Sequence, residues 1–593
     1  MAAILALLLA AAQVPQDAEY WQQDVHYTIE AALDEASGVL HSGATMVYRN
    51  RSPDPLDALY FHLHLNAFRP GSVWSAVEQR PNLQFGDLQE PDYGFERIRE
   101  FTVEGEAVGL SYPHAPDSTV VRVELPSPVA AGDSVVVSMV WDARASTLCR
   151  RQCRRGRHFD FAQWYPRIAP YDAWGWQPHP LYPQGEFYGE FGTYDVTLDL
   201  PDDQVVGATG VPLSGNPGWT PTPDSPADRP VDRSGFYADP VAPRSPGMFA
   251  DAPADGRKRV RFYAEDVHHF SWSADPDFIY EGGAAGDVAV HVLFLPGDVE
   301  WDLGAVVRKT ERALEWLQNA MGDYPWPQLT IVHRMDGGGT EFPMFIGNGG
   351  ASQSLIVHET AHQFAHGILA NNEWRDAWLD EGMASFLTAW FMEDHGVADP
   401  WSGTVGGVAR REAAGVPVPV DTLSEHMPDF STYGHLAYSK PSVMYRMLRE
   451  YLGRDTFRSA LRTYYDRKKL QHVTEQDFRQ AMEDVSGEDL GWFFDQWLHT
   501  TATLDYAIGT VSQEQGADGR WVTEVEIIRR GEAWMPVLLL VGDHVEVLRS
   551  RDPQQVITVL SDERPGFVVV DPGWVLPDTD RSDNQVELGE RPA

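Results

Sequence analysis

The segment HETAH, residues 358–362, places two imidazoles four residues apart with a carboxylate directly after the first. On an α-helix, positions i and i+4 face the same way, so His358 and His362 can hold one metal ion between them. Neutral imidazole is a good ligand for zinc. Glu359 is then placed to act as a general base toward a water molecule at that ion. The spacing therefore predicts a helical zinc site with hydrolytic chemistry.

Two imidazoles hold zinc incompletely, so a third protein ligand is expected. Residues 372–396 read as a second amphipathic helix, which carries Glu381 among apolar side chains such as Trp378 and Phe386. A carboxylate in such surroundings is costly unless it is paired or binds a metal. Glu381 is therefore the predicted third ligand of a single Zn²⁺ ion. His366 continues the histidine stripe by one turn, and we interpret it as packing or as support for the ligands.

The secondary structure that the sequence pattern predicts changes twice along the chain. Residues 20–285 are β-like, with short alternating runs broken by Gly, Pro, Asn and Asp, and 216–254 read as a surface insertion. Residues 286–500 are mixed but mostly helical, and 501–593 are β-like again. The sequence thus predicts a β domain, a mixed α/β domain that carries the metal ligands, and a small C-terminal β domain.

Two helix boundaries near the metal ligands can be predicted from local signals. Asp298 is a plausible N-cap for a helix that ends at Gly322. Pro441 suits the first turn of another helix, which should end at Gly453. Between these two helices, residues 329–332 read as a strand.

The charge balance of the chain is strongly acidic. The 593 residues include 46 lysines and arginines against 87 acidic residues, for a net charge of −41. This field repels phosphate backbones, so nucleic acid is excluded as a partner. It attracts cationic ligands weakly, among them the amino terminus of a peptide, although the simplest role of the charge is solubility.

The first 15 residues resemble a secretory signal peptide. An apolar run is followed by the small residues of segment 10–12, but a basic stretch before it is missing. The run is too short to span a bilayer, and no other segment of the sequence is long enough. We therefore expect a periplasmic or secreted protein without a transmembrane segment, with a cytoplasmic location as the alternative.

The two cysteines, Cys149 and Cys153, lie four residues apart in the run CRRQCRRGR. In an oxidising compartment they can close a small disulfide loop. A structural zinc site is the alternative, but no nearby residues supply the two further ligands that it needs. The arginines of this run are expected to form a solvated loop.

The order and spacing of several motifs resemble the aminopeptidase N family of zinc metallopeptidases, the gluzincins. The resemblance rests on HETAHQF at 358–364 and WLDEGMASF at 378–386, and in the β-like region on QWYPRIAPYDAWGW and GEFYGEFGTYDV. It extends from about Trp21 to about Pro577. It implies a saddle-like or sandwich-like N-terminal β domain, a thermolysin-like catalytic domain of mainly α structure and a C-terminal β-sandwich.

The resemblance also implies two groups of substrate-binding and catalytic residues. GGGTEFPMF, residues 337–345, resembles the family segment whose glutamate binds the free α-ammonium of the substrate, which gives this role to Glu341. Gly338 and Gly339 would leave a bare backbone edge for an extended peptide. The segment YSKP, beginning at Tyr438, resembles the one whose tyrosine stabilises the developing oxyanion. Thr340 and Phe342 depart from the family pattern beside Glu341.

These expectations describe a zinc metallo-aminopeptidase that acts on peptides. Two other classes remain open from the sequence. One is a zinc endopeptidase or another zinc hydrolase on the same scaffold, such as an enzyme that opens epoxides. The other is a binding module without catalysis, which is disfavoured because such relatives usually lose ligands, whereas His358, His362, Glu381 and Tyr438 are all present. Neither the preferred N-terminal residue nor the oligomeric state follows from the sequence.

Overall fold

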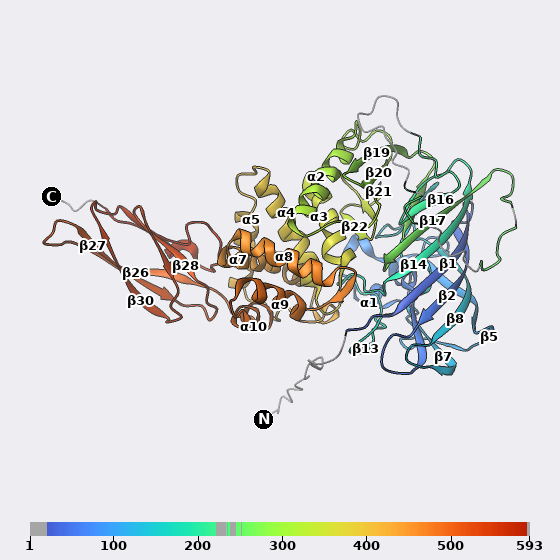
Figure 1. The fold of residues 1–593 in the computed structure, drawn as a ribbon, viewed down its shortest axis with the longest axis horizontal. Coiled ribbons are helices and arrows are strands. Elements are labelled where there is room, and N and C mark those ends of the chain that lie inside the picture. Colours follow the sequence, from blue (N-terminus) through green and yellow to red (C-terminus); the bar gives the residue numbers. More distant parts are fainter. Residues whose placement is uncertain (1–19, 221–232, 234, 238–244, 251, 590–593) are drawn as a thin grey trace. The chain divides into compact units, whose positions relative to one another are not determined.

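The computed structural model describes residues 20–220, 233, 235–237, 245–250 and 252–589 (Figure 1). The chain forms two compact units. Among the described residues, the first comprises 20–183, 188–308 and 326–351, and the second comprises 184–187, 309–325 and 352–589. The predicted signal peptide, residues 1–15, and much of the predicted insertion at 216–254 lie outside the described residues.

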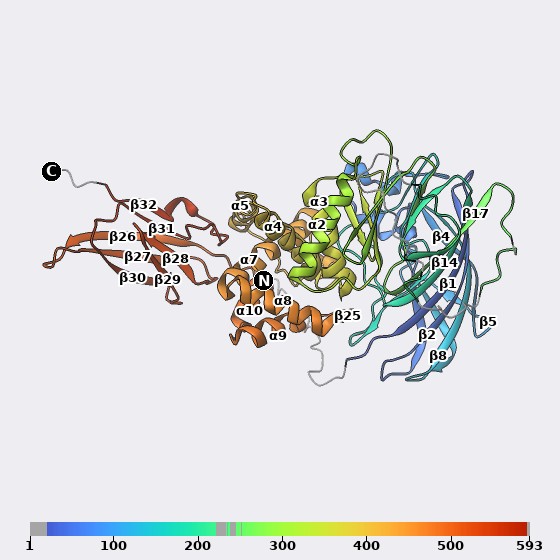
Figure 2. The ribbon, with the colours of Figure 1, turned by 45° about the horizontal axis from the view of Figure 1, so that its top comes forward.

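An eight-stranded sheet dominates the first unit (Figures 1 and 2). In spatial order its strands are β16 (Val211–Ser214), β17 (Arg257–Val267), β14 (Gly192–Pro201), β1 (Asp24–Asp34), β2 (Val39–Arg49), β8 (Ser134–Arg144), β4 (Phe95–Val103) and β5 (Glu106–Ala107). Along β1, alternate residues such as Tyr27, Ile29 and Ala31 are completely buried. This period of two is what places one face of a strand in a core. The alternating runs of the sequence correspond to these strands.

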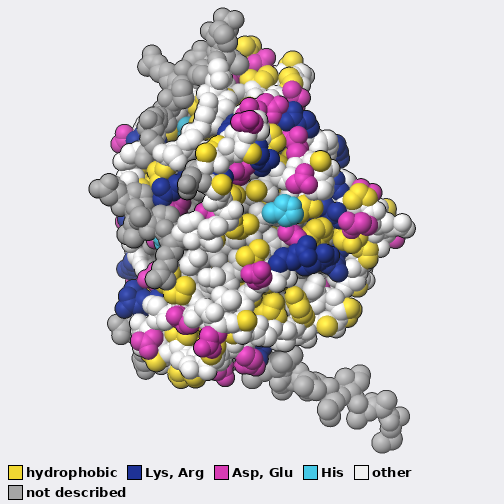
Figure 3. Space-filling view, turned by 90° about the vertical axis from the view of Figure 1, so that its right-hand side faces the viewer, with side chains coloured by type: hydrophobic (Ala, Val, Ile, Leu, Met, Phe, Trp, Pro, Cys, Tyr) yellow, Lys and Arg dark blue, Asp and Glu magenta, His cyan; other side chains and the backbone are white. Residues whose placement is uncertain are grey.

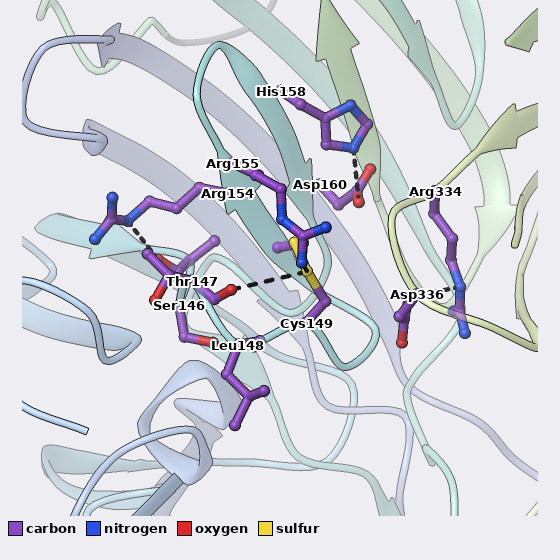
Figure 4. Close-up of a disulfide and its surroundings, with 12 residues drawn as sticks. Ser146, Thr147, Leu148, Cys149, Arg154, Arg155, His158, Asp160, Arg334 and Asp336 are labelled. Carbon is purple, nitrogen blue, oxygen red and sulfur yellow. Dashed lines mark hydrogen bonds and ion pairs between the residues drawn. A yellow bond between two sulfur atoms is a disulfide. The ribbon is translucent and has the colours of Figure 1, made fainter. Parts of the chain in front are cut away.

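Two four-stranded sheets accompany the large one in the same unit. The first consists of β15 (Val205–Ala208), β18 (Trp272–Asp275), β10 (His158–Phe161) and β9 (Cys153–Arg155). The second consists of β11 (Arg167–Ile168), β3 (Leu56–His62), β7 (Val120–Val129) and β6 (Leu110–Ser111). Cys149 and Cys153 form a disulfide at the start of β9, and the side chain of Arg155 donates to Cys149 Sγ (Figure 4).

A five-stranded mixed sheet completes the first unit. Its order is β19 (Ile279–Ala285), β20 (Val288–Phe294), β21 (Gln328–His333), β23 (Phe345–Asn348) and β22 (Gly339–Phe342). Every residue of β20 is buried, as its nearly continuous apolar sequence requires for a strand covered on both faces. All five strands of this sheet, β19 to β23, belong to the first unit.

The helices that follow belong mainly to the second unit. They are α2 (Ala305–Ala320), whose first residues belong to the first unit, then α3 (Gln353–His362), α4 (Met383–Asp394), α5 (Ser402–Ala413), α6 (Phe430–Tyr433), α7 (Lys440–Leu452), α8 (Arg454–Lys468), α9 (Glu475–Ser486) and α10 (Gly491–Leu498). Three π-helical turns interrupt them, at Gln363–Ile368, Trp378–Gly382 and Gly434–Ser439. A short parallel pair, β24 (Leu369–Asn371) and β25 (Gln471–Val473), lies among them.

Two of the predicted helices begin later than expected. Asp298 caps only a turn, since Leu303 and Gly304 have positive φ values of 58° and 67° that interrupt a helix before α2. Residues 372–377 also precede their helix, because the side chain of Asn372 accepts a hydrogen bond from the Trp374 amide and starts a turn. Pro441 lies in the first turn of α7, which continues directly from the π-helical turn Gly434–Ser439, and α7 ends as predicted, with Gly453 after it at φ 85°.

Packing between helices of the second unit fixes the helix that carries the histidines. Val357 of α3 lies in one apolar cluster with Ala313 of α2 and Phe391 of α4. Ser352 caps the N-terminus of α3 by accepting a hydrogen bond from the Leu355 amide at 3.3 Å. Burial on one side and the cap at the end leave α3 little freedom to turn its polar face away.

The last part of the second unit consists of two small antiparallel sheets. One contains β26 (Tyr506–Gln515), β27 (Trp521–Arg529) and β30 (Gln554–Ser561), and the other contains β29 (His544–Leu548), β28 (Val537–Val541), β31 (Phe567–Val570) and β32 (Gln585–Glu587). All seven strands lie within residues 501–593, the region whose sequence is β-like.

The surface is acidic but mixed. On the face shown in Figure 3, acidic and basic side chains are interspersed with apolar ones. Among the described residues, no helix is both long and apolar enough to cross a membrane.

Candidate metal centre

The C-terminal half of α3 presents His358 and His362 on the same side, one helical turn apart. Their Nε2 atoms lie 3.1 Å from each other, and the two rings stand nearly perpendicular, at 86°. His362 is almost fully buried, whereas the His358 side chain keeps 20% of its exposure. The pair therefore forms a donor site that is open on the His358 side.

Glu381 completes this site from the π-helical turn Trp378–Gly382. Its Oε2 atom lies 3.2 Å from Nε2 of His362 and 3.5 Å from Nε2 of His358. A tetrahedral ion with bonds of about 2.0–2.1 Å has ligand atoms roughly 3.3 Å apart. The three donor atoms match that spacing, and their types, two imidazoles and one carboxylate, suit zinc. The structure thus brings the three predicted ligands together in a geometry that fits Zn²⁺.

The protonation of the ligands is set by their neighbours. Burial opposes the charge of Glu381, but the adjacent His362 and His358 hold the pKa of this carboxyl well below its ordinary value, so it is a carboxylate. On its other side, His362 Nδ1 forms a short hydrogen bond to Asp380. With its proton on Nδ1, the imidazole presents the lone pair of Nε2 to the site.

Two further predicted residues lie at the same site. Glu359 is buried in α3, and one of its carboxylate oxygens lies within 4.8 Å of a ring nitrogen of His362. Tyr438, in the π-helical turn before α7, donates its hydroxyl proton to Glu381 Oε1. Its ring lies 6.3 Å from that of His358, nearly parallel to it. Burial, reinforced by the charge of Glu381, raises the Tyr438 pKa well above its ordinary value, so the phenol remains a proton donor.

The predicted ammonium-binding residue belongs to the first unit. Glu341 lies on β22, an edge strand of the five-stranded sheet, and follows Gly338, whose φ is 79°, Gly339 and Thr340 in the sequence. Its Oε1 atom lies 3.9 Å from the guanidinium of Arg151, and both side chains are buried. Arg151 sits inside the disulfide loop, so the expectation of a solvated arginine run is wrong for this residue: the cross-link folds it inward with φ at 61°.

Several polar residues around the metal ligands do not follow from the sequence motifs or their spacing. Asp380 directly precedes the predicted ligand Glu381, and this position is the one feature of the sequence that marks it as part of the site. Glu373 lies in a connecting loop, and no motif in the neighbouring sequence marks it as part of the site. His366 was noticed only as a continuation of the histidine stripe, and the structure places it beside Glu373.

Comparison with solved structures defines the fold. The M1 zinc metallopeptidase of Deinococcus radiodurans covers 81% of this chain with 94% of its own length, at a TM-score of 0.56 and 15% identity. Aminopeptidase A of Legionella pneumophila, solved with aspartic acid, covers 95% of this chain with 60% of its own, at a TM-score of 0.63 and 12% identity. The predicted fold class, a thermolysin-like catalytic domain between two sheet-rich domains, is thereby confirmed.

Sequence comparison then places the metal ligands in a known domain. Residues 348–497 match the Peptidase family M1 domain. The puromycin-sensitive aminopeptidase of Caenorhabditis elegans is 26% identical over 228 residues, which are 35% of this chain and 23% of that protein. The aminopeptidase N of Lactococcus lactis is 25% identical over 154 residues, 24% of this chain and 18% of its own. The chain thus spans about a fifth of the length of these curated relatives.

Proposed function

We propose that this protein is a zinc-dependent peptidase that releases residues from the amino terminus of peptides. The observation that carries the proposal is the triangle of His358, His362 and Glu381 beside the buried Glu359. The similarity of this chain to aminopeptidases and the match of residues 348–497 to the Peptidase family M1 domain support the same proposal. When bound there, zinc supplies a Lewis acid that polarises a carbonyl and makes a water molecule more acidic.

Glu359 is the proposed general base. Its carboxylate lies next to the ligand cluster and is buried, so it is shielded from bulk water and would be close to a water molecule bound at the metal. In this role it removes a proton from the attacking water and then returns it to the leaving amine, which is how one carboxylate serves both halves of hydrolysis. No other described carboxylate of α3 is available for this transfer, since Glu359 is the only acidic residue of that helix.

Tyr438 is the proposed stabiliser of the oxyanion. Its hydroxyl keeps its proton and already points to the Glu381 carboxylate, which is a ligand of the proposed metal centre. A small rotation would redirect this donor to a developing oxyanion at the same place. A donor of this kind contributes about 3–4 kcal/mol to transition-state stabilisation.

Glu341 is the proposed acceptor for the substrate's α-ammonium. It lies on an edge strand whose backbone, beginning at Gly339, pairs only with β23 among the strands of its sheet. An extended peptide can add to such an edge through main-chain hydrogen bonds. A carboxylate on that strand then sets where the chain begins and limits cleavage to the first residue.

Substrates with free and with blocked amino termini test this proposal. The protein should release the first residue of an unblocked tripeptide and leave the N-acetylated tripeptide intact. Replacement of Glu341 by Gln should reduce the difference between the two. Cleavage of both at equal rates would favour the endopeptidase alternative, whereas failure to cleave either in the zinc-loaded protein would contradict peptidase function.

We also propose that the protein is exported. The signal-like segment 1–15 motivates the proposal, and the disulfide between Cys149 and Cys153 supports it, because such bonds persist in oxidising compartments. Amino-terminal sequencing of the protein from its native cells should find a start after residue 10. An intact first residue on protein from the cytoplasmic fraction would contradict export.

A further inference from the structure

Behind the metal centre, the second unit contains another cluster of ligand-type side chains. His366 comes from the π-helical turn after α3, Glu373 from the following loop, and Asp380 from the turn that also carries Glu381. One donor atom from each residue lies within 4.8 Å of the others, and His366 Nδ1 is 3.2 Å from Glu373 Oε1. The cluster is more deeply buried than the metal centre, since Glu373 and Asp380 are completely inaccessible to solvent.

The carboxylates of this cluster lack the partners that buried acids require. Asp380 Oδ1 accepts a hydrogen bond from His362 Nδ1, but among the described residues Asp380 Oδ2 and Glu373 Oε2 have no hydrogen-bond donor, and Glu373 Oε1 has only the His366 imidazole, at 3.2 Å. In the part of the chain that the structure describes, no lysine or arginine forms an ion pair with either acid. Two neighbouring carboxylates without water or a cation are strongly unfavourable.

We propose that His366, Glu373 and Asp380 bind a second divalent metal ion, distinct from the ion held by His358, His362 and Glu381. One imidazole nitrogen and two carboxylate oxygens converge there, a set of three protein ligands of the number and types that bind zinc. The imidazole disfavours Ca²⁺ and Mg²⁺, which prefer oxygen ligands, and favours Zn²⁺ or another first-row transition ion. This proposal goes beyond the proposed peptidase activity, because it needs neither Glu359 nor Tyr438.

The second ion would also act on the first site through Asp380. One oxygen of this carboxylate orients His362, and the other would be held by the ion, so the ligand His362 would be fixed from behind. Its burial suggests that this ion enters as the chain folds and leaves only when the unit opens. The first ion, by contrast, borders the partly exposed His358.

The alternative occupant of the cluster is a proton. Without a cation, burial and the charges of Asp380 and Glu381 raise the pKa of Glu373 well above its ordinary value, so a neutral carboxyl could face the Asp380 carboxylate. A metal ion and a proton in this cluster can be distinguished by the number of metal ions bound per chain.

The test is a metal count by inductively coupled plasma mass spectrometry on the whole protein, folded in the presence of zinc and then dialysed. We expect two ions per chain in the wild type, and one in Glu373→Gln and in His366→Gln. His358→Ala should also retain one ion. Phenanthroline should remove one of the two wild-type ions quickly, and the other only after unfolding.

Glu412→Gln is the matched control, because Glu412 is another buried glutamate beside a histidine, His435, but has Lys440 as a cation. It should keep two ions. One ion in the wild type that disappears in His358→Ala would overturn the proposal, even if Glu373→Gln fails to fold. One ion that survives in His358→Ala and disappears in Glu373→Gln would support the second site and count against the proposed catalytic one.

Discussion

The Nε2 atoms of His358 and His362 lie 3.1 Å apart. Two imidazole nitrogens at this distance either share a proton or share a metal ion, and Glu381 Oε2 at 3.2 Å from the second nitrogen provides the third corner of a metal site. His362 already directs its other nitrogen to Asp380, which leaves Nε2 as the natural donor. The arrangement is therefore best explained as a site prepared for one cation.

Replacement of Glu359 by Gln should separate metal binding from turnover. The amide keeps the shape of the side chain but cannot accept a proton from water, so kcat should fall by about 10²–10⁴-fold. The zinc content should stay at the wild-type value, since Glu359 is not a proposed ligand. Peptide hydrolysis and metal content measured on the same sample check both parts, and near-normal kcat in this variant would refute the general-base role.

Replacement of Tyr438 by Phe should lower kcat by about 10²–10³-fold with little change in KM, because the lost hydrogen bond acts mainly in the transition state. Tyr433→Phe is the matched control. The Tyr433 ring packs edge-on against Tyr438 with the centroids 5.9 Å apart, so it shares the same surroundings. Steady-state kinetics on both variants show which of the two tyrosines stabilises the oxyanion. A large loss of kcat in Tyr433→Phe, without a loss in Tyr438→Phe, would show that Tyr433 and not Tyr438 stabilises the oxyanion.

Replacement of Arg151 by Gln should strengthen the binding of peptides with a free amino terminus. The guanidinium lies 3.9 Å from Glu341 and competes with the substrate ammonium for the same carboxylate. Its removal should lower KM about tenfold, equivalent to about 1.4 kcal/mol. Arg155→Gln changes an exposed arginine of β9, four residues further along the same arginine-rich run, and should leave KM unchanged. A rise in KM for Arg151→Gln would mean that the guanidinium positions Glu341 instead of competing for it.

The first unit should lose stability in mildly alkaline solution because of His158. Burial lowers the pKa of this imidazole, but Asp160 at 2.9 Å and Asp275 at 3.1 Å outweigh that effect and raise it to about 9. The folded state therefore binds the proton more tightly than the unfolded state does. The contribution is complete below a pH of about 6.5 and is lost as the pH rises through about 9, to a total of about 3 kcal/mol.

Calorimetry between pH 6.5 and pH 9.5 checks this prediction. The transition that includes β10 should shift to lower temperature over this range in the wild type, and the shift should be smaller in His158→Gln. Equal shifts in both proteins would show that His158 is not the group responsible.

Much of the site can be predicted from the sequence because its parts are local. The spacing of His358 and His362 depends only on the helical repeat, and the apolar context of Glu381 marks a buried acid. The strands around Tyr27 and along β20 likewise follow from alternation and from apolar runs. The order of the β and helical regions follows from these local signals.

Other features depend on contacts that no local pattern encodes. The π-helical turn at Trp378–Gly382 presents Asp380 to Nδ1 and Glu381 to Nε2 of the same imidazole, His362, which a regular helical repeat does not predict. The meeting of Glu373 with His366, and of Arg151 with Glu341, results from how loops close in three dimensions. Because the sequence does not show the contact with Glu341, it predicts that Arg151 is solvated like the other arginines of the run.

The most direct test of the metal centre is an anomalous difference map, recorded at the zinc absorption edge, from crystals of the zinc-loaded protein. The account predicts a peak about 2.1 Å from His358 Nε2, His362 Nε2 and a carboxylate oxygen of Glu381, and its loss in crystals of Glu381→Gln. A zinc-loaded crystal with no peak among these three side chains would contradict the account.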